Sequence, residues 1–211
     1  MASLYQTGSG NVLSQPRNPW AARGFSFVEV IVALAIMGIL LALALPMLSS
    51  YMDNNRVRNA AEVFVSSAMT AKAEAAQRNA QVEIVLVADP TVTGLATAGI
   101  SSAKGWMVRT FDQTVHIDGM ALAEGGGVGA APVTVAGVDQ DGAALTGVVF
   151  TALGGTTLAK RADFNFTHDT GGTCVAAGGQ IRCLRISVTT TGRVKLCDPA
   201  VTVLTDTRSC N

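Results

Sequence analysis

The sequence predicts an α+β protein in which one long N-terminal helix packs on an antiparallel β-sheet. Apolar residues recur at helical spacing as far as about Arg78, and from Gln81 onward the period shortens to two, which is typical of strands. Of the 211 residues, 49% are hydrophobic and 14% are charged, a composition that excludes a disordered chain. The 15 basic and 15 acidic residues balance, which excludes an overall basic field for collecting nucleic acid.

Residues 1–24 are expected to form a leader without regular structure. They contain two arginines and no acid, and they show no apolar periodicity. In a secretory signal peptide the apolar region precedes the cleavage site, so cleavage removes it. Here the apolar run follows Arg23 and Gly24, so cleavage at that point would leave the run on the mature chain.

Residues 25–45 form an apolar run that is interrupted only by Ser26, Gly38 and Glu29. A helix of this length measures about 31 Å, enough to cross a bilayer, and we expect it to do so. The arginines of the leader favour a cytoplasmic N-terminus, although Arg56 and Arg58 oppose this orientation from the far side.

Glu29 is the one ionisable group in this run. A carboxylate near the centre of a bilayer costs at least about 2.5–3.5 kcal/mol and usually has a functional partner. Glu29 could instead lie among the headgroups, where it would favour the positive end of the helix dipole. Both interpretations remain open on position alone.

Residues 46–80 are predicted to continue the helix with an amphipathic pattern. Pro46 lacks a backbone donor, so a kink is expected there rather than an end. Asn79 is the expected C-terminal stop. A coiled coil with so many alanines would be weak, so the small side chains favour packing on a sheet. The buried stripe comprises Val57, Ala60, Ala61, Phe64, Ala68, Ala71 and Ala75.

Residues 81–211 are predicted to be a β-rich globular domain that packs on the helix. Glycine-rich and threonine-rich turns separate seven short alternating segments, a pattern that favours an antiparallel sheet. The segments are marked by Val82/Ile84/Leu86, Trp106/Val108, Val133/Val135, Val148/Phe150, Phe164/Phe166, Leu184/Ile186/Val188 and Val194/Leu196.

Four cysteines lie in the C-terminal region: Cys174, Cys183, Cys197 and Cys210. An even number on the exported side of a membrane indicates two disulfides. Zinc binding is disfavoured because the closely spaced cysteine pairs of zinc sites are absent from the sequence, and no metal is expected. Three pairings are open, with a weak preference for Cys174–Cys183 and Cys197–Cys210.

No motif of an enzyme or of a cofactor site occurs in the sequence, so neither catalysis nor a cofactor is expected. The two histidines, His116 and His168, lie outside any metal motif. His168, next to Asp169, is interpreted as a histidine of a surface turn. The glycines of residues 125–129 do not precede a helical pattern, which disfavours phosphate binding there.

A basic cluster lies near the C-terminus, where no acid occurs from Gln180 to Leu196. If residues 189–192 form a turn, the cations on the two flanking strands could make one positive patch for DNA phosphates. The competing and favoured interpretation is an ordinary solvated strand face. The cluster comprises Arg182, Arg185, Arg193 and Lys195.

Two parts of the sequence resemble known families. The stretch GFSFVEVIVALAIMGILLALALP (24–46) resembles the leader junction and N-terminal helix of type IV pilins and type II secretion pseudopilins. Further motifs resemble the GspH/FimT branch, whose type IVa members include minor pilins of the FimU/FimT kind. They are AKAEAAQRNAQVEI (71–84), Gly105-Trp106, DFNFTHDTGG (163–172) and IRCLRISVTTTGRVKLCDP (181–199).

This resemblance implies the pilin fold and a prepilin peptidase that cuts after Gly24 and N-methylates Phe25. It also gives Glu29 a partner, since the new amino group of Phe25 on a neighbouring subunit could neutralise the carboxylate and fix the register of assembly. Implied partners are other minor and major pilins and an inner-membrane assembly platform. The implied location is the inner membrane, with a cytoplasmic N-terminus and a periplasmic domain, and then the pilus.

The implied function is that of a minor type IV pilin that primes pilus assembly and sits in or at the tip of the filament, in support of adhesion or twitching. Two alternatives remain open. One is a minor pseudopilin of the type II secretion system. The other is a DNA-binding minor pilin of natural transformation, because residues 192–195 (GRVK) resemble the G-R-x-R element of DNA-uptake members.

Overall fold

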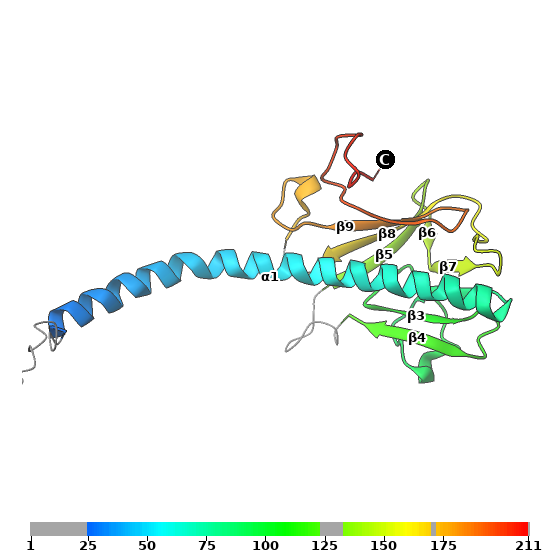
Figure 1. Ribbon diagram of the computed structural model, residues 1–211, viewed down its shortest axis with the longest axis horizontal. Coiled ribbons are helices and arrows are strands. Elements are labelled where there is room, and N and C mark those ends of the chain that lie inside the picture. The colour runs from blue at the N-terminus through cyan, green and yellow to red at the C-terminus, as the bar shows by residue number, and fades with distance from the viewer. Residues whose placement is uncertain (1–24, 123–132, 170–171, 211) are drawn as a thin grey trace, which may run out of the picture. The chain divides into compact units, whose positions relative to one another are not determined.

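A computed structural model describes residues 25–122, 133–169 and 172–210 of the chain. The chain divides into two compact units, residues 1–44 and 45–211. One helix, α1 (Phe27–Arg78), contributes to both units (Figure 1). The long helix is therefore confirmed, whereas a kink at Pro46 stays a prediction.

The C-terminal end of α1 is closed by Asn79, as the sequence predicts. Asn79 adopts a left-handed conformation with φ 50°. Its backbone N–H donates to the carbonyl of Ala76 at 3.4 Å, and the N–H of Ala80 donates to the carbonyl of Ala75 at 3.2 Å. This pair of bonds is the Schellman motif, which satisfies carbonyls left over at the end of a helix.

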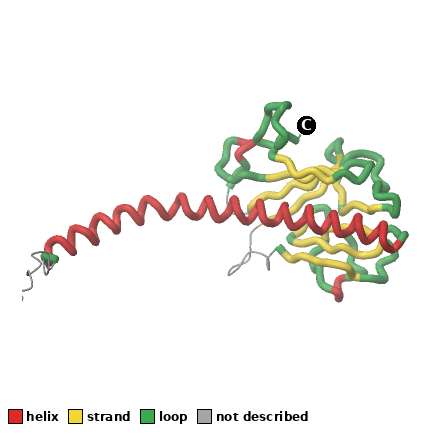
Figure 2. The backbone as a smooth tube through the Cα atoms, in the orientation of Figure 1, coloured by secondary structure: helices red, strands yellow, loops and turns green. Residues whose placement is uncertain are grey.

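The strands form two antiparallel sheets within residues 45–211 (Figure 2). The first has the order β4-β3-β1-β7 and the second the order β10-β9-β8-β5-β2, with β6 paired to β5. The first sheet comprises β1 (Val82–Leu86), β3 (Gly105–Thr110), β4 (His116–Ala121) and β7 (Gly147–Phe150). The second comprises β2 (Ser102–Ala103), β5 (Val133–Asp139), β6 (Ala144–Leu145), β8 (Ala162–His168), β9 (Leu184–Val188) and β10 (Val194–Cys197).

All seven predicted strand segments are strands in the structure. Three further strands, β2, β4 and β6, were not predicted because two of them have only two residues and β4 has no regular alternation of buried and exposed positions. The expectation of a single sheet is corrected to two. Alternation shows which residues face the core, but it does not show which strands are neighbours.

The core lies where the C-terminal half of α1 meets both sheets, and Phe64 is at its centre. The Phe64 ring lies 5.1 Å from that of Trp106 on β3, and 4.9 Å and 5.5 Å from those of Phe164 and Phe166 on β8. One helix side chain therefore contacts both sheets. The predicted small-residue stripe of α1 is buried here, and the α+β class with a helix packed on antiparallel sheet is confirmed.

Candidate functional site

The N-terminal part of α1 presents an apolar surface. Every side chain from residue 25 to residue 42 is exposed, and nearly all of them are apolar. Glu29 lies in the first turn of the helix, where the dipole favours a negative charge. Gly24, the expected cleavage position, lies outside the described residues. An apolar surface of this extent indicates a site that other molecules cover.

None of the helices, over the residues that the structure describes, has the length and hydropathy that a bilayer span requires. The span expected for residues 25–45 therefore stays a prediction.

Two disulfides shape the C-terminal region. Cys174 pairs with Cys183, and Cys197 pairs with Cys210, with Cα–Cα distances of 5.4 Å and 5.1 Å. This is the pairing that the sequence analysis preferred. Each bond closes a loop, and the first loop contains the short 3₁₀ helix η2 (Val175–Ala177). The two loops are called the C-terminal loops below.

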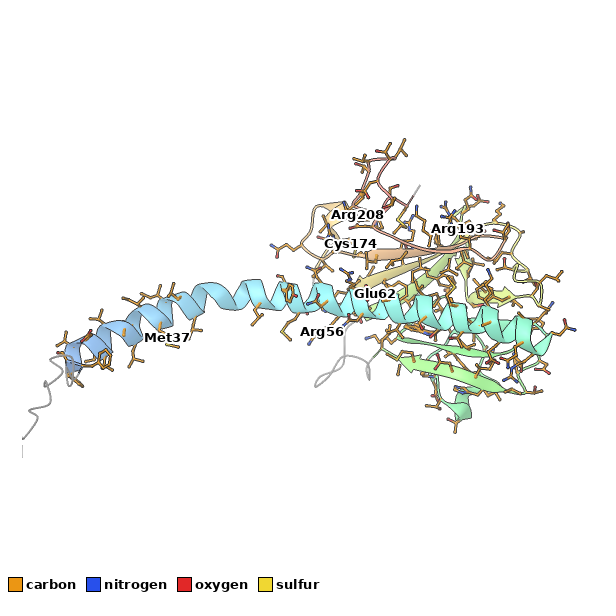
Figure 3. All side chains as sticks on the ribbon, in the orientation of Figure 1. Met37, Arg56, Glu62, Cys174, Arg193 and Arg208 are labelled. Carbon is orange, nitrogen blue, oxygen red and sulfur yellow. A yellow bond between two sulfur atoms is a disulfide. The ribbon has the colours of Figure 1, made fainter. Side chains whose placement is uncertain are left out.

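A groove of about 580 Å³ lies between the C-terminal loops and residues 51–58 of α1. Figure 3 shows the loops, labelled at Cys174 and Arg208, beside the part of α1 that carries Arg56 and Glu62. The backbone N–H of Arg182 donates to the side chain of Asn54 at 2.7 Å and so joins the first loop to the helix. The groove is lined by Tyr51, Asn54, Asn55, Arg58, Val175, Gln180, Arg182, Leu184, Leu196, Cys197, Asp198 and Arg208.

Each arginine of the groove pairs with one carboxylate. Arg58 contacts Glu62 at 2.7 Å, and Arg182 contacts Asp198 at 2.9 Å. Arg208 contacts Asp206 at 2.7 Å, and its hydrogen bonds lower the pKa of that carboxyl to about 2. All three arginine side chains remain more than half exposed.

The four cations of the predicted DNA patch do not form one patch of unpaired charges. Arg182 is paired with Asp198, as described above. Arg185 donates to the side chain of Asn165 at 2.8 Å, and Lys195 donates to the carbonyl of Ser209 at 2.7 Å. Arg193 is exposed, and within the described residues its guanidinium has no ion pair or hydrogen bond. Three of the four cations are therefore engaged within the domain, and DNA binding by this cluster stays a prediction.

His168 is not the surface-turn histidine that the sequence analysis expected. It is buried at the end of β8, and its Nε2 lies 3.2 Å from Oδ1 of Asp53 on α1. Its position continues the alternation of Phe164 and Phe166, a signal that could have placed it on the core face. Asp53 also accepts a hydrogen bond from Arg56 at 3.0 Å.

Asp169, the neighbour of His168, is exposed, and its carboxylate has partners other than the histidine. Lys104 lies 2.7 Å from its carboxylate, and the hydroxyl of Thr134 donates to it. Burial raises the pKa of Asp169, but the bonds from Lys104 and Thr134 outweigh it and the pKa is lowered. This cluster fixes the end of β8, and no group of three His, Cys, Asp or Glu residues able to hold a metal occurs among the described residues.

The sequence analysis missed the groove as a site. Its lining comes from α1, from the two C-terminal loops and from β9 and β10. Residues 51–58 of α1 lie more than a hundred residues before the other lining segments, and no spacing rule connects the two parts.

Loss of the Cys197–Cys210 bond is expected to lower the free energy of unfolding by about 3 kcal/mol, because a loop of 13 residues regains its freedom in the unfolded chain. Urea unfolding of the full chain with both cysteines replaced by serine measures this loss. The control replaces Cys174 and Cys183, whose loop has 9 residues and should cost slightly less. A loss below about 1 kcal/mol in both variants would show that the loops are held by other contacts.

Comparison with known proteins gives two family matches. Residues 21–45 match the prokaryotic N-terminal methylation motif, and residues 60–192 match the family described as type II transport protein GspH. No curated protein matches the chain. Two crystal structures of the Pseudomonas aeruginosa type IV minor pilin FimU show low similarity to this chain. In space group P21 the identity is 17%, with 69% of this chain and 91% of that chain covered and a TM-score of 0.47. In space group P65 the identity is 15%, with 66% of this chain and 90% of that chain covered and a TM-score of 0.44.

Proposed function

Because this chain belongs to the GspH family of pilin-type proteins, we propose that it is a minor type IV pilin, a structural subunit that primes assembly of the filament and sits in it or at its tip. The observation that carries this proposal is the methylation motif at residues 21–45 together with the exposed apolar side chains of residues 25–42. An apolar helix surface of this extent marks a site that is covered by lipid or by other chains.

The proposal includes processing and location. A prepilin peptidase cuts after Gly24 and methylates Phe25, and the helix of residues 25–45 anchors the chain in the inner membrane. The globular domain of residues 81–211, with the amphipathic continuation of the helix at residues 46–80, lies in the periplasm. The two disulfides suit that compartment, because disulfides form and persist in an oxidising environment.

The proposal also includes a role for Glu29 in assembly. When subunits leave the bilayer, their apolar helices cover one another, and a carboxylate among them needs a cation. The methylated amino group of Phe25 on the adjacent subunit supplies it. Because an unpaired buried charge costs several kcal/mol, the pair fixes the axial register of neighbours, which are other minor and major pilins.

A minor pseudopilin of the type II secretion system is the second candidate, and the description of the matching family as a type II transport protein favours it. It uses the same helix and the same processing. DNA uptake is a weaker third candidate, because three of the four candidate cations are engaged within the domain.

Fractionation of the host distinguishes the first two candidates. We expect the tagged chain in sheared filaments, with fewer filaments in a strain that lacks the gene and with exoprotein secretion unchanged. Loss of secretion with filament number unchanged would contradict the pilin proposal and support the pseudopilin.

A further inference from the structure

We propose that oxidation of the four cysteines to two disulfides fixes residues 51–58 of α1 on the domain, and that this chain is the substrate of a dithiol oxidase that carries out the oxidation. Of the proposed function, the inference uses only the location of the domain outside the cytoplasm, where disulfides form and persist.

Apolar packing holds α1 on the sheets only from Val57 onward. Buried side chains recur along the helix from Val57 to Ala75, whereas every side chain from Tyr51 to Arg56 is exposed or half-buried. A segment with few buried apolar contacts opens at a lower free energy than the core. The position of residues 51–56 therefore depends on polar contacts with other segments.

Polar contacts from two other segments reach this part of α1. Nε2 of His168, on β8, lies 3.2 Å from Oδ1 of Asp53. Since β8 is paired with β5 and β9 in the second sheet, this contact does not need a disulfide. The other contact is the hydrogen bond of 2.7 Å from the backbone N–H of Arg182 to the side chain of Asn54. Arg182 directly precedes Cys183, so the first disulfide closes the loop that carries this donor.

The second disulfide holds the same arginine through its side chain. Nε of Arg182 lies 2.9 Å from Oδ2 of Asp198, which directly follows Cys197. Cys197 pairs with Cys210, and inside the loop that this bond closes the N–H of Asp198 donates to the carbonyl of Arg208 at 2.8 Å. Both disulfides therefore converge on Arg182, and Arg182 contacts the helix.

The two C-terminal loops have little apolar anchorage of their own. The first loop contains one buried apolar side chain, that of Ile181, and the three residues of η2 are exposed. In the second loop, which the structure describes from end to end, no apolar side chain between Cys197 and Cys210 is buried. Conformational entropy favours an open loop once its disulfide is reduced. Reduction should therefore release Arg182 from its position and break its bond to Asn54.

The pairing indicates which reaction supplies the oxidised chain. Each disulfide joins cysteines that follow one another in the sequence, so oxidation in the order of synthesis gives this pairing without rearrangement by an isomerase. One thiolate of a pair attacks the disulfide of the oxidase and forms a mixed disulfide, and the second thiolate attacks that bond and releases the oxidase as a dithiol. For each bond formed, the chain loses two electrons and two protons, and the disulfide of the oxidase gains them.

Hydrogen–deuterium exchange of the full chain in detergent micelles tests the effect on the helix. Cys174→Ser together with Cys183→Ser removes the first disulfide. In the first minutes, the amides of residues 51–58 should exchange about tenfold faster in this variant than in the oxidised chain, because a hydrogen bond to the segment is lost. Residues 60–75 should stay protected in both chains. Equal acceleration over both ranges, or none over residues 51–58, would overturn the inference.

Asn54→Ala tests the same contact with both disulfides intact, and so decides the matter even if the cysteine variant does not fold. It removes the acceptor of the Arg182 N–H and should also speed exchange over residues 51–58 about tenfold. Asn59→Ala is the matched control, because Asn59 is an exposed asparagine of the same helix and its replacement gives the same gain in helix propensity. An effect of Asn54→Ala no larger than that of Asn59→Ala would contradict the inference.

Alkylation of free thiols in the host tests the oxidase step. In a strain that lacks its dithiol oxidase all four cysteines should react, and in the wild type or a strain that lacks a disulfide isomerase none should. Native disulfides formed without the oxidase, or formed only with the isomerase, would refute this step. If the chain enters filaments but exchange over residues 51–58 does not depend on the disulfides, this inference fails and the proposed function stands. If the chain is oxidised and its helix is fixed as described but it never enters filaments, the proposed function fails and this inference stands.

Discussion

Phe64→Ala is expected to lower the free energy of unfolding by about 3–5 kcal/mol, the largest loss of stability that any single substitution described here should cause. Phe64 is fully buried, and its ring contacts those of Trp106, Phe164 and Phe166. Truncation removes the apolar transfer free energy, leaves a cavity and removes three aromatic pairs. Because Trp106 and Phe164 lie in different sheets, the packing of both sheets on α1 is weakened at once.

Urea unfolding of the purified chain, followed by circular dichroism, measures this loss. Phe111→Ala is the matched control, because it removes the same atoms from an exposed position and should change stability by no more than about 0.5 kcal/mol. A loss below about 1 kcal/mol for Phe64→Ala would contradict a core centred on this residue.

Glu29→Ala is expected to reduce incorporation into filaments at least about tenfold while leaving the amount of chain in the membrane fraction unchanged. Removing one partner of a buried ion pair costs about 3–5 kcal/mol, and in the proposed pair the amine of Phe25 on the neighbouring subunit would be left unpaired among apolar helices. Membrane insertion does not depend on the pair, since the apolar side chains from residue 25 to residue 42 are unchanged.

The ratio of tagged chain in sheared filaments to chain in membranes measures this effect. Glu62→Ala, which removes an exposed glutamate paired with Arg58 on the same helix, is the control and should have little effect on the ratio. Glu29→Asp keeps the charge and should retain part of the incorporation. Normal incorporation of Glu29→Ala into filaments would contradict the proposed role of the Glu29 carboxylate in assembly.

Features with a local signal could be predicted from the sequence. The helical stripe around Phe64, the stop at Asn79 and the seven alternating strand segments each depend on residues within a few positions of one another. The division into two sheets could not be predicted, because β1 pairs with β3 and β7, and the second partner lies about sixty residues away.

The candidate sites show the same limit. The basic cluster is adjacent in sequence, but the groups that engage it, among them Asp163, Asp198 and the carbonyl of Ser209, come from other segments. A count of nearby charges therefore overestimated the unpaired charge. His168 was interpreted as a histidine of a surface turn, whereas it is buried and continues the alternation of Phe164 and Phe166 along β8.

The mass of the intact chain from sheared filaments, with the sequence of its first residues, tests the central claim most directly. The account predicts a chain of residues 25–211 that begins with N-methylated Phe25 and contains two disulfides. A chain in filaments that retains Met1, or one that begins beyond Leu45 and so lacks the apolar helix, would contradict it.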